Sequence, residues 1–308
     1  MSSRLSRGIQ RIIDRARDKP PRPDRLALVN GEIPEGFAHE YDLDALCLVT
    51  PRGHDFQMYV TPRYRAHYVQ QSYEPFTVDL LSSVLRRGGL FVDIGASYGF
   101  FSLLARARNP TLDIIAAEPT PETCAVLRRN VSEFGKSSIA VRQLAVSDSV
   151  GRANFKVSLA SDSCGFYEHP NAATLRSIEV ETTTVDALLE GREPCPLMIK
   201  IDTEGHERAV LAGMAKTLER FTDIKLFVEF SPATLRAAGV QPNALLRHLD
   251  HLGFEMHLLD EQQVRARRLP LCSGGICGRA LATLFRTVRS SAGALACPGQ
   301  RNPRRYKC

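Results

Sequence analysis

The stretch FVDIGASYGFFS, residues 91–102, decides the fold of this 308-residue chain. An apolar strand ends at Asp93, a loop with Gly95 and Gly99 follows, and a helix begins after it. In open α/β sheets, ligands bind beyond the carboxyl ends of strands, where such loops lie. Gly95 has no side chain, so a ligand can approach the backbone there, and N–H groups at a helix start favour an anionic group. The stretch therefore predicts a cofactor-binding loop.

The spacing of its glycines excludes two common phosphate sites. Dinucleotide sites use G-x-G-x-x-G and P-loops end in Gly-Lys-Ser/Thr, whereas here Asp93 is followed by Gly95 and Gly99. An acid in this position repels a pyrophosphate. S-adenosylmethionine has no phosphate and carries an ammonium group, a carboxylate and a sulfonium cation. We therefore expect Asp93, Gly95, Ser97 and Gly99 to bind this cofactor.

A second strand adds a carboxylate at the same edge of the predicted sheet. The segment IIAAEP, residues 114–119, ends in Glu118, 25 residues after Asp93. An acid at this strand end can accept two hydrogen bonds from ribose hydroxyls. Pro119 ends the strand and Pro121 begins the next helix, which keeps Glu118 near the glycine loop. We expect Glu118 to bind the ribose.

Strands alternate with helices from residue 73 onward. We expect strands at 90–94, 113–118, 138–144, 197–202, 224–230, 254–259 and 279–285, and helices at 74–85, 98–108, 121–134, 206–220 and 241–252. This alternation is typical of a mostly parallel sheet with helices on both faces. Within 151–183, the strand-like segments 153–157 and 178–184 have no obvious helix between them. They predict a β-insertion near the sheet edge.

The N-terminal part differs from this pattern. Residues 4–17 place apolar side chains at helical spacing, and prolines between 19 and 23 end that helix. Residues 26–73 look like short strands and turns around 41–49 and 56–60. We expect residues 1–69 to form an extension that caps the substrate side, residues 70–288 to form the cofactor-binding domain, and residues 289–308 to be a basic tail.

Composition favours a soluble cytoplasmic enzyme. The chain is 44% hydrophobic, has no apolar run long enough to span a membrane, and has eight cysteines without a C-x-x-C pair. The charge is uneven: +5 over residues 1–25, +10 over 262–308 and −9 between them. The basic ends suit weak contact with a membrane surface. The acidic core argues against a stable nucleic-acid partner.

Further motifs then occur in a fixed order: YEP at 73–75, VDIGASYG at 92–99, EP at 118–119, LAVSD at 144–148, TVDAL at 184–188, IKIDTEGHE at 199–207 and VEF at 228–230. Over residues 70–260 the chain resembles the FkbM-type methyltransferases. The resemblance implies a class I methyltransferase fold of seven strands, the last antiparallel, and methyl transfer from S-adenosylmethionine to a hydroxyl on a sugar, glycolipid or other secondary metabolite. It also implies that Glu74 assists at the methionine part, and that Ser147 and Asp148 meet the adenine.

The fourth strand of the domain predicts the catalytic side. Asp202, Glu204 and His206 follow strand 197–202, at the mouth of the cofactor site. The sulfonium already makes the methyl group reactive, so the enzyme must align the acceptor oxygen and remove its proton. Histidine suits this by its ordinary pKa and Asp202 by its position. We expect this cluster to act without a tightly bound metal, although carboxylates could instead hold a divalent ion that acidifies the hydroxyl.

Other assignments remain open at this stage. Glu207 caps a helix or joins the cluster, and Lys200 pairs with Asp93 or Glu229. We interpret His54, His169 and His248 as surface or packing residues. The rival functions are an NAD-dependent oxidoreductase, a non-catalytic S-adenosylmethionine-binding protein, and a methyltransferase acting on nucleic acid or protein.

Overall fold

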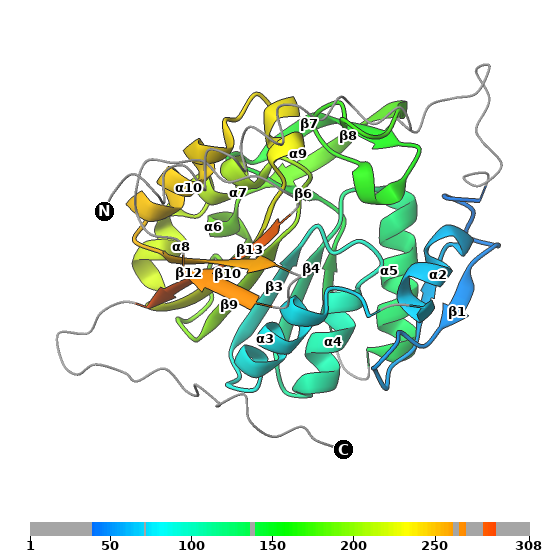
Figure 1. Cartoon of the computed structure of the whole chain (residues 1–308), viewed down its shortest axis with the longest axis horizontal. Coiled ribbons are helices and arrows are strands. Elements are labelled where there is room, and N and C mark those ends of the chain that lie inside the picture. Colours follow the sequence, from blue (N-terminus) through cyan, green and yellow to red (C-terminus); the bar gives the residue numbers. More distant parts are fainter. Residues whose placement is uncertain (1–38, 71, 136–138, 261–264, 269–279, 288–308) are drawn as a thin grey trace.

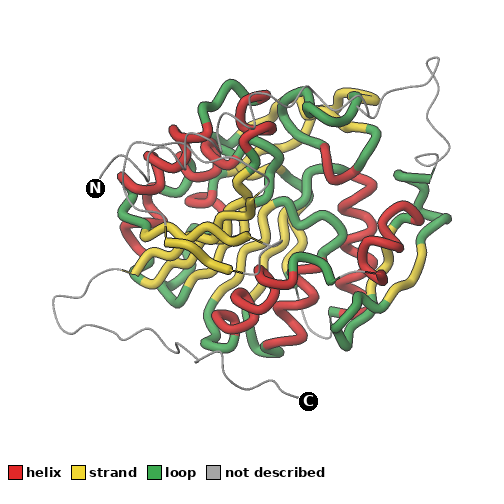
Figure 2. The backbone as a smooth tube through the Cα atoms, viewed as in Figure 1, coloured by secondary structure: helices red, strands yellow, loops and turns green. Residues whose placement is uncertain are grey.

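A central sheet covered by helices on both faces organises the chain (Figures 1 and 2). The computed structural model describes residues 39–70, 72–135, 139–260, 265–268 and 280–287. The predicted helix 4–17 and the basic tail 289–308 lie outside the described residues. None of the described helices is both long and apolar enough to cross a membrane.

The sheet has eight strands in the order β12-β11-β13-β10-β9-β3-β4-β5. Five neighbours are parallel: β5 (Ala140–Arg142), β4 (Asp113–Ala117), β3 (Leu90–Ile94), β9 (Leu197–Ile201) and β10 (Asp223–Phe230). β13 (Ala280–Thr287) runs antiparallel between β10 and β11 (Glu255–Asp260), and β12 (Arg265–Arg268) pairs with β11 at the edge. All seven predicted strands are present, the last is antiparallel as expected, and β12 is an eighth strand that we did not predict.

Successive strand residues enter two different cores. Leu90, Val92 and Ile94 face one core with helices α6 (Val185–Leu188), α7 (Glu207–Ala212), α8 (Ala215–Arg220), α9 (Pro232–Ala237) and α10 (Pro242–His251). Phe91 faces the other core with α3 (Pro75–Leu85), α4 (Phe100–Arg108) and α5 (Pro121–Phe134). Because both faces are buried, each parallel strand is a continuous apolar run, which is why the sequence predicted them well.

Two small sheets flank the central one. β1 (Cys47–Val49) and β2 (Met58–Val60) form a hairpin followed by α2 (Pro62–Gln70), and they share the core of α4 and α5. β7 (Gly151–Ser158) and β8 (Thr174–Thr183) form the predicted insertion, which includes the 3₁₀ helix η2 (Ser161–Ser163), and β6 (Ala145–Val146), which precedes it in sequence, pairs with β8. We refer to residues 151–183 as the insertion.

Three details of the prediction are wrong. The helix expected at 206–220 is two helices, α7 and α8, because the chain turns at Gly213, where a Cβ would lie 2.2 Å from the Ser147 carbonyl oxygen. The segment 62–70 is a helix rather than strands and turns. Helix α9 was not predicted, because it is only six residues long and carries little periodicity.

Gly95 joins β3 to the loop after β9. It has φ +77°, and a Cβ there would lie 1.8 Å from the backbone oxygen of Asp202. The Asp202 N–H donates to the carbonyl of Ile94 (3.0 Å), so the two strand ends remain side by side. Gly95 is therefore required for packing of the protein itself, and not only for the approach of a ligand.

We predict that Gly95→Ala destabilises the fold much more than Gly191→Ala. Both glycines have left-handed backbones, but nothing lies within 4 Å of a Cβ at Gly191. Gly191→Ala should cost about 1–2 kcal/mol from backbone strain alone. Gly95→Ala must also displace the Asp202 backbone, so its midpoint in urea unfolding should fall further. Equal midpoints for the two variants would contradict this packing role.

Candidate active site

A cavity of about 670 Å³ opens at the carboxyl ends of β3, β4, β9 and β10. The floor comes from the loops after these strands, and side chains of α2 and the insertion form the opposite wall. Ligands of open α/β sheets bind at this edge. The expected location of the site is thus also where the described residues enclose a cavity.

The predicted site residues divide into two groups. Those that line the cavity are Glu74, Gly95, Ser97, Glu118, Asp202 and Glu204. Those that do not are Asp93, Gly99, Ser147, Asp148 and His206. The second group does not line the cavity: Asp93, Ser147 and His206 are buried, whereas Asp148 is exposed.

Glu118 is held by backbone donors. The Thr120 N–H donates to Oε1 (2.9 Å) and the Ser97 N–H donates to Oε2 (3.0 Å), while the side chain lines the cavity. Burial raises the pKa of Glu118 to about 7, although these two donors work against the rise. The carboxylate is therefore fixed in place and keeps lone pairs for hydroxyl donors in the cavity.

The glycine loop uses its own N–H groups internally. Gly95 and Ala96 both donate to the carbonyl of Ala117 (3.0 Å each), and Ser97 donates to Glu118. These three amides are thus used within the protein, and the first helical residue of α4, Phe100, comes after them. Ser97 has φ +49° and Gly99 has φ +90°, so the loop is tightly curved around the cavity edge.

Asp93 lies in a buried charge cluster. It is 1% exposed and accepts a hydrogen bond from the Ser102 hydroxyl (2.7 Å). Lys200 is its register partner on β9, and the Lys200 ammonium lies 2.6 Å from Oδ2 of Asp202. Both partners considered for Lys200 lie on neighbouring strands, Asp93 on β3 and Glu229 on β10, but the direct ion pair of the ammonium is with Asp202.

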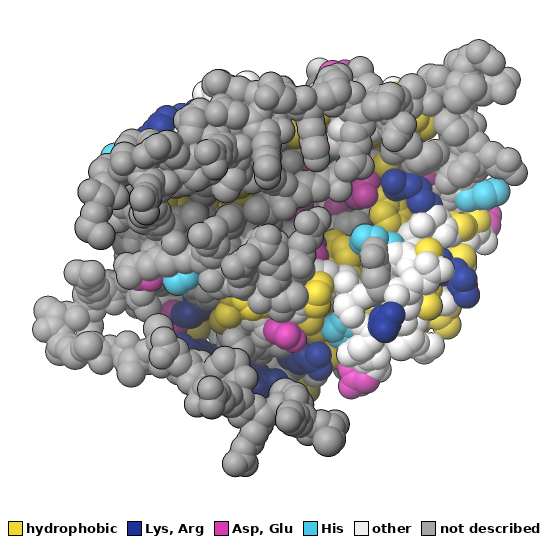
Figure 3. All heavy atoms as spheres, in the orientation of Figure 1, with side chains coloured by type: hydrophobic (Ala, Val, Ile, Leu, Met, Phe, Trp, Pro, Cys, Tyr) yellow, Lys and Arg dark blue, Asp and Glu magenta, His cyan; other side chains and the backbone are white. Residues whose placement is uncertain are grey.

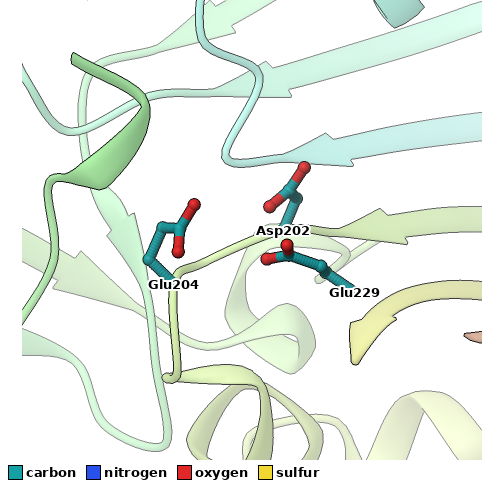
Figure 4. Close-up of side chains that lie close together, drawn as sticks. All are labelled: Asp202, Glu204 and Glu229. Carbon is teal, nitrogen blue, oxygen red and sulfur yellow. The ribbon is translucent and has the colours of Figure 1, made fainter. Parts of the chain in front are cut away.

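Three carboxylates meet on the cavity floor (Figure 4). Asp202 and Glu204 follow β9, Glu229 lies near the end of β10, and one oxygen of each lies within 4.8 Å of the others. Burial opposes the charge of Asp202, but the Lys200 ammonium and a hydrogen bond with Glu229 together lower its pKa, whereas burial and the neighbouring acids raise the pKa of Glu229 well above its usual value. Of the two acids, Glu229 therefore holds a proton more readily. The set could also bind one cation through oxygen ligands.

His206 lies outside the cavity wall. It is 8% exposed and packs on the Phe166 ring at 4.1 Å, with Nε2 at 2.9 Å from the Ser147 hydroxyl and Nδ1 at 3.3 Å from the Tyr167 hydroxyl. Burial lowers its pKa to about 4. Both ring nitrogens have partners in the protein, so the position of His206 favours a structural role over proton transfer.

Ser147 and Asp148 lie beside His206 rather than in the cavity. The Ser147 hydroxyl donates to Asp148 (3.2 Å) and the Ser147 N–H donates to Thr183 (2.7 Å). The segment just before them, 144–146, lines the cavity instead. In this region the side chains that reach the cavity are therefore the apolar ones just before Ser147 and Asp148.

The sequence missed the residues that close the cavity from the opposite side. Tyr64, His67 and Tyr68 of α2 line it, as does Tyr73 before α3. Pro62 at the first position of α2 was a helix-start signal that could have revealed them. His169 of the insertion also lines the cavity, and no local pattern marks it.

Basic side chains do not gather on the face seen in Figure 3. On the part formed by described residues, Lys and Arg are scattered among hydrophobic, acidic and neutral side chains. Acidic side chains predominate in the cavity, which Glu74, Glu118, Asp162, Asp202, Glu204 and Glu229 all line. Such a cavity attracts a cation and repels phosphate.

Comparisons with known proteins agree with this picture. The model of the methyltransferase FkbM domain matches residues 93–256. The chain is 32% identical over 162 residues to 31-O-demethyl-FK506 methyltransferase FkbM of Streptomyces tacrolimicus, covering 42% of this chain and 61% of that protein. It is 26% identical over 200 residues to hexuronic acid methyltransferase AglP of Haloferax volcanii, covering 63% and 77%.

Among solved structures, the tRNA (uracil-54, C5)-methyltransferase of Pyrococcus abyssi, in complex with S-adenosyl-L-homocysteine, is similar with a TM-score of 0.43. It is 12% identical, and the match covers 79% of this chain and 44% of that one. The chain spans 61% of the first curated relative's length. Because the family model covers more than half of the sequence, the protein belongs to the FkbM methyltransferase family.

Proposed function

We propose that this protein transfers the methyl group of S-adenosylmethionine to a hydroxyl oxygen of a sugar, glycolipid or other secondary metabolite. The observation that carries the proposal is the set of carboxylates around one cavity at the ends of four adjacent parallel strands. The two curated relatives are named for methylation of a demethylated FK506 and of a hexuronic acid, which supports a hydroxyl-bearing acceptor.

The donor occupies the β3–β4 side of the cavity in this proposal. Glu118 accepts hydrogen bonds from the ribose hydroxyls, Gly95 and Ser97 border the methionine part with Glu74, and the apolar segment 144–146 contacts the adenine. Asp93 and Gly99 support the loop from behind, and Ser147 and Asp148 support the adenine side. Of the residues first expected to bind the cofactor, some therefore contact it in this proposal, and the others support the residues that do.

Charge explains both binding and release. The cavity contains more carboxylates than cationic groups, so it favours a ligand with sulfonium and ammonium charges. Loss of the methyl group turns the sulfonium into a neutral thioether. One attraction therefore disappears at the moment of transfer, and the demethylated product binds less tightly than the donor.

The acceptor lies on the β9–β10 side. Its oxygen attacks the methyl carbon, the carbon–sulfur electron pair returns to sulfur, and the hydroxyl proton passes to a carboxylate. The acceptor oxygen becomes strongly acidic as the new bond forms, so a carboxylate is a sufficient base. Asp202 and Glu204 have this position, whereas His206 does not. The β1–α2 unit, at the C-terminal end of the proposed extension 1–69, acts as a cap through Tyr64, His67 and Tyr68.

The rival functions fit the cavity less well. A nicotinamide dinucleotide or a nucleic acid would bring phosphates against the acidic wall. A non-catalytic binder has no need for acids on the acceptor side. Weak membrane contact would involve the basic ends 1–25 and 262–308, of which the structure describes only 265–268 and 280–287.

We predict that donor affinity depends on the ionisation of Glu118. Ribose hydroxyls donate to the carboxylate, so binding is strong above the pKa of about 7 and weakens as the pH falls below it. Methylthioadenosine is the best probe, because it contains the ribose without the titrating amino-acid part. Its dissociation constant by calorimetry should be about tenfold higher at pH 6 than at pH 8.

Glu118→Gln is the control for this pH dependence. The amide cannot ionise, so the variant should bind weakly and equally at both pH values, with a loss of about 1–3 kcal/mol relative to wild type at pH 8. Wild-type binding of S-adenosylmethionine itself should be in the micromolar range, about −8 kcal/mol. Tight NADH binding without any response to S-adenosylmethionine would falsify the proposed function.

We predict that Glu204→Gln lowers kcat by about 10²–10⁴ fold and leaves donor affinity nearly unchanged. The assay uses labelled S-adenosylmethionine with sugar and glycolipid extracts, and the labelled product identifies the acceptor. His206→Gln should keep most of the wild-type rate, because His206 lies outside the cavity. A chelator should have little effect. If chelation abolishes the reaction and magnesium or manganese restores it, the carboxylates are metal ligands instead.

A further inference from the structure

His169 lies in the cavity although it is far in sequence from every motif. It follows η2 in the insertion, is 8% exposed, and its Nε2 lies 3.4 Å from Oε2 of Glu204. From the sequence we interpreted His169 as a surface or packing residue. Its contact with a proposed catalytic carboxylate is a feature that this interpretation does not include.

The backbone fixes which nitrogen of His169 carries the proton. The Asn171 N–H donates to Nδ1 at 3.2 Å, so Nδ1 is the acceptor in the neutral ring. The ring proton is then on Nε2, the atom that faces Glu204. The imidazole therefore presents an N–H donor to the Glu204 carboxylate and does not present a basic nitrogen to the cavity.

Glu204 is equally constrained on its own side. It has φ +52°, which is strained for a residue with a side chain, and Gly205 follows at φ +104°. Oε1 of Glu207 accepts from the N–H groups of Thr203 (3.3 Å) and Gly205 (3.0 Å), which ties the turn together. A strained turn held in this way directs the Glu204 side chain into the cavity (Figure 4).

The two carboxylates after β9 have different partners. Asp202 pairs with the buried Lys200 ammonium at 2.6 Å, and this pairing makes Asp202 a weak base. Glu204 faces the imidazole of His169, with Nε2 at 3.4 Å from Oε2. Because Asp202 is engaged by the Lys200 ammonium, we assign the role of proton acceptor to Glu204.

We propose that His169 is the positioning residue of a His169–Glu204 pair, in which Nε2–H holds Glu204 in place to take the proton of the acceptor hydroxyl. This inference rests on the proposed methyl transfer. The oxygen–methyl bond forms, the carbon–sulfur bond breaks with its electrons going to sulfur, and the proton goes to Glu204. His169 keeps its own proton throughout and does not contact the reacting atoms.

The first test needs no acceptor. Full-length protein with ¹⁵N-labelled histidine is studied by two-bond nitrogen–proton correlation at a pH where the ring is neutral. His169 should show the Nε2–H form, and Glu204→Gln should shift its ring signals. Asp162→Asn, which removes another acid of the cavity, should leave them in place. An Nδ1–H form, or ring signals that do not respond to Glu204→Gln, overturns the pair.

The second test uses the acceptor isolated in the labelled-product assay. His169→Ala should lower kcat roughly 10–100 fold with little change in KM or in donor affinity, a smaller loss than that of Glu204→Gln. His169→Gln should restore most of the rate, because its amide N–H can donate to the carboxylate. His251→Gln, on the exposed side of α10, should behave as wild type.

Two activity results would overturn the role of His169: full activity of His169→Ala, or a His169→Gln variant as slow as His169→Ala despite intact donor binding. If the wild type methylates no acceptor at all, the proposed function fails, and the nitrogen–proton correlations still decide whether the pair exists. Retained donor binding in each variant shows that it is folded.

Discussion

The buried pair between Lys200 and Asp202 is the interaction on which the rest of the site depends. Lys200 is 2% exposed in the middle of an apolar sheet, where an unpaired ammonium would cost several kcal/mol. Burial opposes its charge, but Asp202, Glu74 and Asp93 together raise its pKa above the usual value. One cation therefore sits among several acids and keeps the carboxyl ends of β3 and β9 polar at the point where the cavity begins.

The same strand ends are joined by backbone contacts that leave no room for a side chain. The Asp202 N–H donates to Ile94, and Gly95 approaches the Asp202 carbonyl so closely that no side chain fits between them. The loop that borders the proposed donor site and the loop that carries Asp202 thus form one rigid floor. A substitution in one of these loops therefore also displaces the other. This is why Gly95 matters both to folding and to the shape of the cavity.

The features that depend on a local sequence pattern could be predicted from the sequence. The contacts between segments that are distant in sequence could not. The apolar strands, Glu118 at the end of β4 and the loop around Gly95 follow from periodicity and from residue types at strand ends. His206 was considered as a base because of the ordinary pKa of histidine, but at the start of α7 its ring contacts Ser147 and Phe166 and does not line the cavity. His169 reaches the cavity through the insertion, and neither its spacing nor its neighbours in sequence reveal that contact.

The acids of the cavity are distinguished by their partners rather than by their own chemistry. An ammonium lowers the pKa of Asp202, burial raises the pKa of Glu118 to about 7 against two backbone N–H donors, and burial and neighbouring acids raise the pKa of Glu229 well above its usual value. Glu204 faces a histidine donor. A site that attracts a cationic donor needs ionised carboxylates, and the acid that takes the proton must be ionised as well. Each acid lies beside a different partner, and so the acids of one cavity differ in pKa. A cationic donor then neutralises the negative charge of the carboxylates that line the cavity.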